Sequence, residues 1–247
     1  MFTVREHSYP AGLRQASHAH SETTVSMILR GSIRERSGAH VEIGRAFSIV
    51  VKPGGTEHAD DFGDVTTRTI QISIDAGTAA ELTANEPSLG VWRWHHGSQA
   101  VRAFLDLADL RRNSPGPDSA EAVANATTDV LGALRAGGPS RGATPDWLMA
   151  ARHEIDDSPL PRVAEVAARH AVHPVYFARA FRSHFGWSVT EYLRWRRIQS
   201  AAAAISGTTR TLSSIAAEAG YSDHAHMCRE FRRSTGRSPG DLRDRSA

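Results

Sequence analysis

The chain has 247 residues, which is long enough for two domains of ordinary size that each bury a core. Its single cysteine, Cys228, excludes an intramolecular disulfide and is typical of a reducing compartment. No apolar run reaches a membrane-spanning length and the N-terminal segment lacks the apolar core of a signal peptide, so we expect a cytoplasmic protein with no membrane partner.

The charge changes character midway along the chain. Residues 1–145 hold 14 basic and 16 acidic side chains, a net charge of −2, whereas residues 146–247 hold 15 and 11, a net charge of +4. All the basic residues of the second part are arginine, whose planar guanidinium suits phosphate and guanine edges. This asymmetry is expected if only the second part meets nucleic acid, although many solvated surfaces carry a comparable excess.

Short β-branched segments follow one another between Phe2 and about His96, separated by glycine and proline turns. Closely spaced strands of this kind favour an antiparallel sandwich or barrel. We therefore expect a β domain over residues 1–98. The clearest strands are predicted at Val25–Leu29, Val41–Ile43, Phe47–Val51, Thr66–Ile74 and Val91–Trp94.

Two amphipathic helices are predicted over residues 99–136. Apolar side chains recur at helical spacing in Ala100–Arg112 and in Ala120–Leu134, and the prolines between these segments force a turn. This helical hairpin could pair two copies of the chain or cover the sheet, and the sequence leaves both interpretations open. The glycine- and proline-rich residues 137–145 predict a linker.

Residues 146–247 are predicted to be entirely helical. Pro174 and Pro239 suit early positions of a helix, where a missing amide hydrogen costs nothing, and Ser188 and Ser222 are the predicted N-caps of the helices that follow them. The helices are expected at about 146–155, 161–170, 174–184, 188–205, 212–219, 223–234 and after residue 239.

A ten-residue pattern, RxFRxxxGxS, occurs twice in this part, beginning at Arg179 and again fifty positions later at Arg229. A helical period turns the phenylalanine of each copy inward and its basic neighbours outward. A duplicated helical segment with a basic face is typical of proteins that read duplex DNA. Four buried positions follow from the helical period: Phe177, Phe181, Met227 and Phe231.

Each copy lies in the second helix of a predicted helix-turn-helix, with a small residue, Ala167 or Ala216, where two helices cross. Arg179 and Arg229 are the predicted base readers, because arginine recurs at the same position in both copies. For Arg232 or Arg233 alone, a solvated or ion-paired role is the preferred interpretation. The full set expected to face DNA is Val175, Tyr176, Ala178, Arg179 and Arg182, then His224, Ala225, Cys228, Arg229, Arg232 and Arg233.

Residues from about 147 to 243 resemble the DNA-binding domain of AraC-type (AraC/XylS) transcriptional regulators. The matching stretches include Val166-Ala167, Phe177–Phe181, Gly186–Ser188, Ile215-Ala216, Ala219–Asp223 and Arg229–Phe231. The resemblance implies seven helices, two helix-turn-helix motifs and control of promoters in double-stranded DNA, and it suggests RNA polymerase as a further partner. The departures are His173, where a capping serine is usual, Met227, where phenylalanine is common, and Pro239-Gly240 followed by Asp241-Leu242, where an aromatic residue is common.

Residue spacings in the β domain resemble the two motifs of cupin barrels, carried here by Gly12, His18, His20, Gly31, Pro53, Gly55 and His58. Three imidazoles could bind a divalent metal, but Thr24 stands where a carboxylate usually completes the first motif. The resemblance to AraC-type regulators implies instead a metal-free barrel that holds a small effector. We therefore expect no metal or other cofactor, with the three histidines as ligands if a divalent metal does bind. The residues expected to line the effector site are His18, His20, His58, Trp92 and Trp94.

These observations predict a multi-domain α+β protein, with an N-terminal cupin-like β-barrel and trailing helices followed by an all-α domain of two helix-turn-helix motifs over residues 146–247. The expected function is effector-controlled, sequence-specific regulation of transcription, in which a single chain or a homodimer reads successive major-groove segments. An alternative is a metal-dependent cupin enzyme with an accessory helical DNA-binding domain. The sequence argues against this enzyme, because it offers no nucleophile with a matched base and hence no catalytic residue. Another is a packaging protein that binds all DNA equally.

Overall fold

The computed structural model describes residues 2–85, 87–97, 100–113, 120–135, 144–158 and 161–244. The chain divides into two compact units. The first compact unit combines residues 1–136 with residues 198–247, and the second comprises residues 137–197. Among the described helices, none has both the length and the apolar character needed to cross a bilayer.

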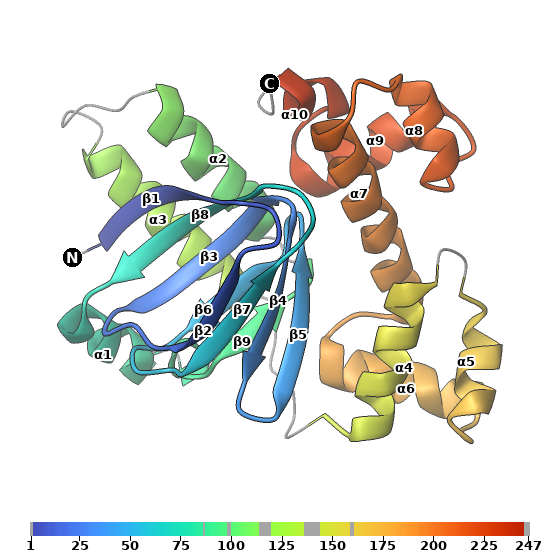
Figure 1. Ribbon diagram of the computed structural model, residues 1–247, viewed down its shortest axis with the longest axis horizontal. Coiled ribbons are helices and arrows are strands. Elements are labelled where there is room, and N and C mark those ends of the chain that lie inside the picture. The colour runs from blue at the N-terminus through green and yellow to red at the C-terminus, as the bar shows by residue number, and fades with distance from the viewer. Residues whose placement is uncertain are drawn as a thin grey trace. The chain divides into compact units, whose positions relative to one another are not determined.

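The β part of the first compact unit consists of two antiparallel sheets, drawn in blue to green in Figure 1. The larger sheet has the strand order β1 (Phe2–Tyr9), β8 (Thr67–Ile74), β3 (Thr23–Arg30), β6 (Ile49–Lys52) and β9 (Arg93–His95). The smaller sheet has the order β2 (Arg14–His18), β7 (His58–Phe62), β4 (Ser32–Ser37) and β5 (His40–Arg45). Two such sheets form the double-layered barrel that is typical of cupin-like domains.

The interior of the barrel is filled by side chains that alternate along the strands with outward-facing ones. Ile70, Ile72 and Ile74 of β8 are completely buried. A second apolar group joins the two sheets and consists of Ile28, Ile33, Val50, Phe62 and Trp94. Each buried aliphatic or aromatic side chain of this size contributes about 1.5–3 kcal/mol to folding, so the barrel has a core of its own.

All five predicted strands are present, with ends that differ from the predicted ones by at most two residues. The strand predicted from Phe47 begins at Ile49, because Phe47 has a φ of 67° and its N–H donates to the Ile28 carbonyl in a turn. The strand predicted from Val91 begins at Arg93. The sequence analysis missed the four strands β1, β2, β4 and β7.

Three α-helices and one short 3₁₀ segment are described between β8 and residue 136. α1 (Ala76–Asn85) was not predicted; the Asp75 carboxylate accepts hydrogen bonds from its first amides. A short 3₁₀ segment, η1 (Pro87–Gly90), follows it. α2 (Ala100–Asn113) and α3 (Ala120–Arg135) confirm the two predicted amphipathic helices and pack against each other.

The predicted turn at residues 113–117 lies outside the described residues apart from its first position, and the predicted linker lies outside them apart from its last two positions. The hairpin's role in pairing two chains stays a prediction.

Seven described helices follow residue 144, the number that the resemblance implied. The second compact unit contains α4 (Asp146–Asp157), α5 (Val163–Arg169), α6 (Pro174–Phe185) and the beginning of α7 (Val189–Gly207). The first contains the remainder of α7 together with α8 (Leu212–Glu218), α9 (His224–Thr235) and α10 (Pro239–Asp244). α7 is therefore continuous across the boundary between residues 197 and 198.

Side-chain hydrogen bonds to backbone N–H groups determine where α7 and α9 begin. Ser188 caps α7 as predicted, in a reciprocal arrangement in which its hydroxyl accepts from the Glu191 N–H and the Glu191 carboxylate accepts from the Ser188 N–H at 2.8 Å. The predicted cap of α9 was wrong by one residue. Asp223, not Ser222, accepts from the His226 N–H, at 2.7 Å, because a carboxylate is the stronger acceptor at the positive end of a helix.

Candidate functional site

α6 and α9 are structural copies of each other. Each helix has twelve residues and ends at a glycine in the left-handed conformation, Gly186 with φ 76° or Gly236 with φ 74°. In each copy the N–H of that glycine donates to an arginine carbonyl four residues earlier, at 2.9 Å in both cases. The repeated RxFRxxxGxS pattern is therefore a repeated structure, with glycine at the one position that requires a positive φ.

The buried side of both helices is as predicted. Phe177, Phe181, Met227 and Phe231 are completely buried. The turns that precede the two helices are also equivalent, because Val172 and Tyr221 each donate a backbone hydrogen bond to the small residue at the helix crossing, at 3.0 and 2.9 Å. These contacts fix the outward faces of α6 and α9, which carry the residues predicted to meet DNA.

The side chains predicted to face DNA lie on the exposed faces, except that Cys228 is partly buried with its Sγ 3.2 Å from His224 Nε2. Val175 and Tyr176 are among the few large apolar side chains that are exposed, at 56% and 58%. Because apolar side chains at the start of a recognition helix can contact thymine methyl groups, their exposure favours a role in binding.

The arginines of the two copies differ in their partners. Arg233 pairs with Glu230 at 3.3 Å, as expected for a surface ion pair. Within the residues that the structure describes, no hydrogen bond or ion pair engages the guanidinium of Arg179 or Arg229. Both are exposed, so both can accept a partner from outside the chain.

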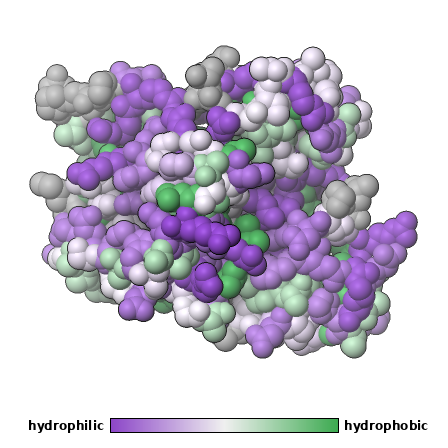
Figure 2. Space-filling view, viewed as in Figure 1, coloured by the Kyte–Doolittle hydropathy of each residue, from purple (hydrophilic) through white to green (hydrophobic). Residues whose placement is uncertain are grey.

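Figure 2 shows that hydrophilic side chains cover much of the visible face, with apolar ones in small areas. The exposed large apolar residues of the described chain are Val65, Val91, Val175 and Tyr176.

A second site lies in the barrel, where β2 and β7 bring His18, His20 and His58 together. His18 pairs with His58 in the strand register, and one ring nitrogen of each histidine lies within 4.8 Å of the other two. The Nδ1 atoms of His18 and His58 each lie 2.9 Å from the backbone carbonyl two residues earlier, that of Ala16 and that of Thr56. The structure thus assembles the three histidines that the sequence analysis selected.

A buried ionic network lies next to the histidines, and sequence reasoning did not find it. Lys52 Nζ is 3.0 Å from Glu35 Oε2 and 3.8 Å from Asp60 Oδ2, and Asp60 Oδ2 is 3.8 Å from His58 Nε2. The Trp92 indole donates to Glu35. Two signals were available, since Lys52 is the only lysine in the chain and Glu35 alternates in phase with the buried Ile33.

Burial sets the protonation of these groups. Burial, together with the nearby charge of Lys52, lowers the pKa of His58 to about 4. Burial also lowers the pKa of His20, followed by the effects of His18 and Lys52. Burial raises the pKa of Glu35, against the opposing effect of Lys52. His20 and His58 are consequently neutral near pH 7 and present an unprotonated nitrogen.

The two tryptophans predicted to line the effector site lie in different surroundings. Trp92 contacts the ionic network through Glu35 and is half-buried. Trp94 is buried in the apolar group that joins the sheets.

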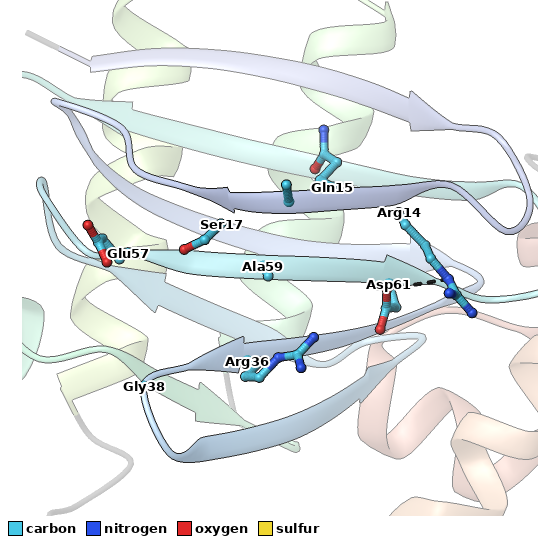
Figure 3. Close-up of a pocket in the computed structure, with 9 residues that line it drawn as sticks. Arg14, Gln15, Ser17, Arg36, Gly38, Glu57, Ala59 and Asp61 are labelled. Atoms are coloured by element: carbon cyan, nitrogen blue, oxygen red, sulfur yellow. Dashed lines mark ion pairs between the residues drawn. The ribbon is translucent and has the colours of Figure 1, made fainter.

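The outer face of the smaller sheet carries an open groove of about 740 Å³. Figure 3 shows it lined by side chains of β2, β4 and β7, including the ion pair of Arg14 with Asp61 at 3.8 Å. Ala59 and Asp61 alternate along β7 with His58 and Asp60, so the groove and the histidines lie on opposite faces of this strand. No sequence pattern predicted this groove.

Comparison with known proteins gives a family match, two relatives and a similar solved structure. The family described as "Helix-turn-helix domain" matches residues 166–245. Over 89 residues the chain is 35% identical to the regulatory protein SoxS of Salmonella typhimurium, an alignment that covers 36% of this chain and 82% of SoxS. It is 32% identical over 88 residues to an uncharacterised HTH-type transcriptional regulator of Haemophilus influenzae, of which it spans only 28%. Among solved structures, ToxT of Vibrio cholerae aligns over 98% of both chains with 9% identity and a TM-score of 0.40.

Proposed function

The chain belongs to the AraC-type (AraC/XylS) family of transcriptional regulators, and on this premise we propose that it recognises a specific promoter sequence through the outward faces of α6 and α9. One observation carries the proposal. Two structurally equivalent helices present an exposed arginine at the same position, Arg179 and Arg229, and within the described residues neither guanidinium takes part in a hydrogen bond or an ion pair. A regulator's role, rather than an enzyme's, agrees with the regulatory relatives.

The position of each arginine in its helix supports a contact with guanine. Both stand at the sixth position of a twelve-residue helix, and residues in the N-terminal half of a recognition helix reach base edges. Residues near the end of such a helix, such as Arg232, more often reach phosphate.

The length of α7 supports reading by one chain at two places. Its 19 residues span about 28 Å at 1.5 Å per residue. That length is compatible with recognition helices in successive major-groove segments, which are about 34 Å apart.

Control by a small effector in the barrel completes the proposal. The supporting observation is that polar groups converge in the barrel interior. Lys52 lies between the carboxylates of Glu35 and Asp60, and Asp60 also lies next to His58. An effector changes DNA binding only if its affinity differs between the competent and incompetent states. Pairing of two chains through α2 and α3, and contact with RNA polymerase, belong to the same proposal.

Contacts inside the first compact unit offer a route for that control. Arg237, just after α9, pairs with Asp109 of α2 at 2.8 Å and also with Asp106. Gln199 of α7 donates to the Ala46 carbonyl at 3.0 Å and to Ser48 at 3.1 Å, next to β6. Within the first compact unit, direct contacts thus join the residue that follows α9 to α2, and α7 to the residues just before β6.

The test is selection of bound duplexes from a random oligonucleotide pool by the full chain, followed by measurement of dissociation constants at a fixed salt concentration of about 0.15 M. A sequence-specific regulator enriches one motif and binds it at least about 1,000-fold more tightly than unselected DNA. Equal affinity for selected and unselected duplexes would instead support the packaging protein and overturn the proposal.

A further inference from the structure

We propose that Trp147 of α4 is a positioning residue for DNA recognition, because it holds the ring of Tyr176 in place on the outward face of α6. The two rings stack, with centroids 5.9 Å apart and an angle of 26° between their planes. Aromatic pairs prefer an offset stack at this separation. This role rests on the proposed function and gives the first helix-turn-helix motif a base contact that the second motif lacks.

Trp147 is fixed by the core next to it. It is the second residue of α4 and is half-buried against the apolar group that contains Phe177 and Phe181. Its ring centroid lies 6.3 Å from that of Phe177, which is completely buried. An indole that packs on a close-packed core has little freedom to rotate, so it offers Tyr176 a fixed surface.

Tyr176 is supported on one side but remains open to a partner from outside the chain. It is the third residue of α6 and is 58% exposed. Within the part of the chain that the structure describes, no hydrogen bond engages its hydroxyl group. Arg179 follows three positions later, so the two side chains lie on the same face of the helix. The ring therefore lies beside the predicted base reader.

Support by Trp147 makes this ring a better contact. A free side chain loses rotamer freedom when it is immobilised in an interface, and that loss weakens binding. Because the Tyr176 ring already stacks on Trp147 in the free protein, less of this freedom remains to be lost. Residues at the beginning of a recognition helix reach base edges in the major groove, where the thymine methyl group accepts apolar contacts. The partner of the Tyr176 ring is accordingly a thymine.

The corresponding position of α9 is different. His226 stands fifty residues after Tyr176, again at the third position of its helix. Its Nδ1 lies 3.1 Å from the Ser222 hydroxyl oxygen and its Nε2 lies 4.0 Å from a Glu230 carboxylate oxygen. Its ring also meets the edge of the Tyr221 ring, with centroids 5.3 Å apart. Both nitrogens of His226 thus face groups of its own motif, so the thymine contact belongs to the first motif.

The test uses the full chain and the duplex site that it selects from a random pool. The readout at each base pair is the preference, which is the ratio of the dissociation constants for the altered and the selected site. Tyr176→Ala should lower the preference at one A·T pair at least about 5-fold and thereby identify that pair. Trp147→Leu, which keeps apolar bulk but removes the flat ring, should lower it about 2- to 10-fold at the same pair.

Two further variants separate positioning from a general loss of stability. Trp147→Phe keeps an aromatic face and should restore most of the preference. Trp187→Leu is the matched control, because Trp187 is another half-buried tryptophan of the same core. It should lower the thermal midpoint without changing the preference. In the Tyr176→Ala background, Trp147→Leu should cause no additional loss, since Trp147 acts through that ring.

An unchanged preference in Trp147→Leu, an equal loss in Trp187→Leu, or an additional loss in the double variant would overturn the proposal. If Trp147→Leu unfolds the chain, Trp147→Met provides the second variant. A wild-type chain that selects a site but keeps its preference in these Trp147 variants leaves the proposed regulatory function intact. A wild-type chain that selects no site at all would overturn that function together with this role of Trp147.

Discussion

Substitution of Arg179 and Arg229 tests whether these two residues contact bases, as the sequence predicts. Replacing either one with alanine should weaken binding to the selected site by about 1–3 kcal/mol and relax the preference at one base pair. Arg233→Ala is the control, because Arg233 is already paired with Glu230 and should lose little specificity. Equal losses on selected and random duplexes would assign Arg179 and Arg229 to phosphate contacts.

Ala171 and Gly220 occupy equivalent positions after α5 and α8, and both have a positive φ, 55° and 78°. The left-handed conformation costs a residue with a Cβ about 1–2 kcal/mol, part of which glycine offsets through its larger entropy loss on folding. Ala171→Gly should therefore stabilise the first helix-turn-helix motif by up to about 1 kcal/mol, and Gly220→Ala should destabilise the second by about as much. Urea unfolding measures the change in unfolding free energy of each variant. Changes of the same sign in the two variants would contradict the prediction.

At the scale of the element, the caps of α6 and α9 are unequal although the helices are copies. Asp223 accepts the His226 N–H at 2.7 Å, whereas the His173 ring accepts the Val175 N–H at 3.2 Å. Asp223→Ala should cost about 1 kcal/mol, and His173→Asp should gain a similar amount. Ser222→Ala is the control, because Ser222 is the predicted cap and Asp223 is the observed one. If thermal unfolding shows that Ser222→Ala lowers stability as much as Asp223→Ala, the assignment of Asp223 as the cap is contradicted.

The elements also differ in how well the sequence predicted them. Helices after residue 144 were located within one or two residues at most ends, because Pro174, Pro239 and the repeated glycines fix where helices begin and end. β4 and β7 were missed because charged residues, such as Glu35 and Asp60, occupy buried positions in them. A hydrophobic pattern cannot predict a strand whose inward face carries ions.

The same reason limited the prediction of the barrel site. The histidines were found because their spacing resembles a known motif, and the structure brings them together. The contact of Glu35 and Asp60 with Lys52 depends on the sheet register, which the sequence pattern does not provide.

At the scale of the whole molecule, Arg237 tests whether the barrel's helices and the second helix-turn-helix motif act together. Its ion pair with Asp109 is mostly buried, with side-chain exposures of 24% and 20%. A double-mutant cycle of Arg237→Gln and Asp109→Asn should give a coupling energy of about 0.5–1 kcal/mol in urea unfolding. Arg210 with Glu218 is a more exposed pair for comparison. If the stability changes of Arg237→Gln and Asp109→Asn simply add in the double variant, the two residues are not coupled.

The pH dependence of stability offers another test of the whole chain. Burial, followed by the charges of Arg93 and His96, lowers the pKa of His95 to about 4, whereas an unfolded histidine titrates near 6.5. Between these values the unfolded chain takes up a proton that the folded chain refuses, so stability should fall as the pH drops from 6.5 to 4 and stay level above 6.5. His95→Gln should remove about 1–2 kcal/mol of this loss at pH 5 in urea unfolding, while His40→Gln should leave it unchanged.

The two copies share a skeleton but present different side chains outward, with Val175 and Tyr176 on one and His224 and Ala225 on the other. A site read by two unlike helices in one chain does not look the same from the opposite strand. Under the proposed function, the bound protein would therefore have a polarity along the DNA, with a fixed upstream and downstream side. Inverting the site would turn the whole barrel to the other flank, so a promoter could distinguish one insertion from its reverse.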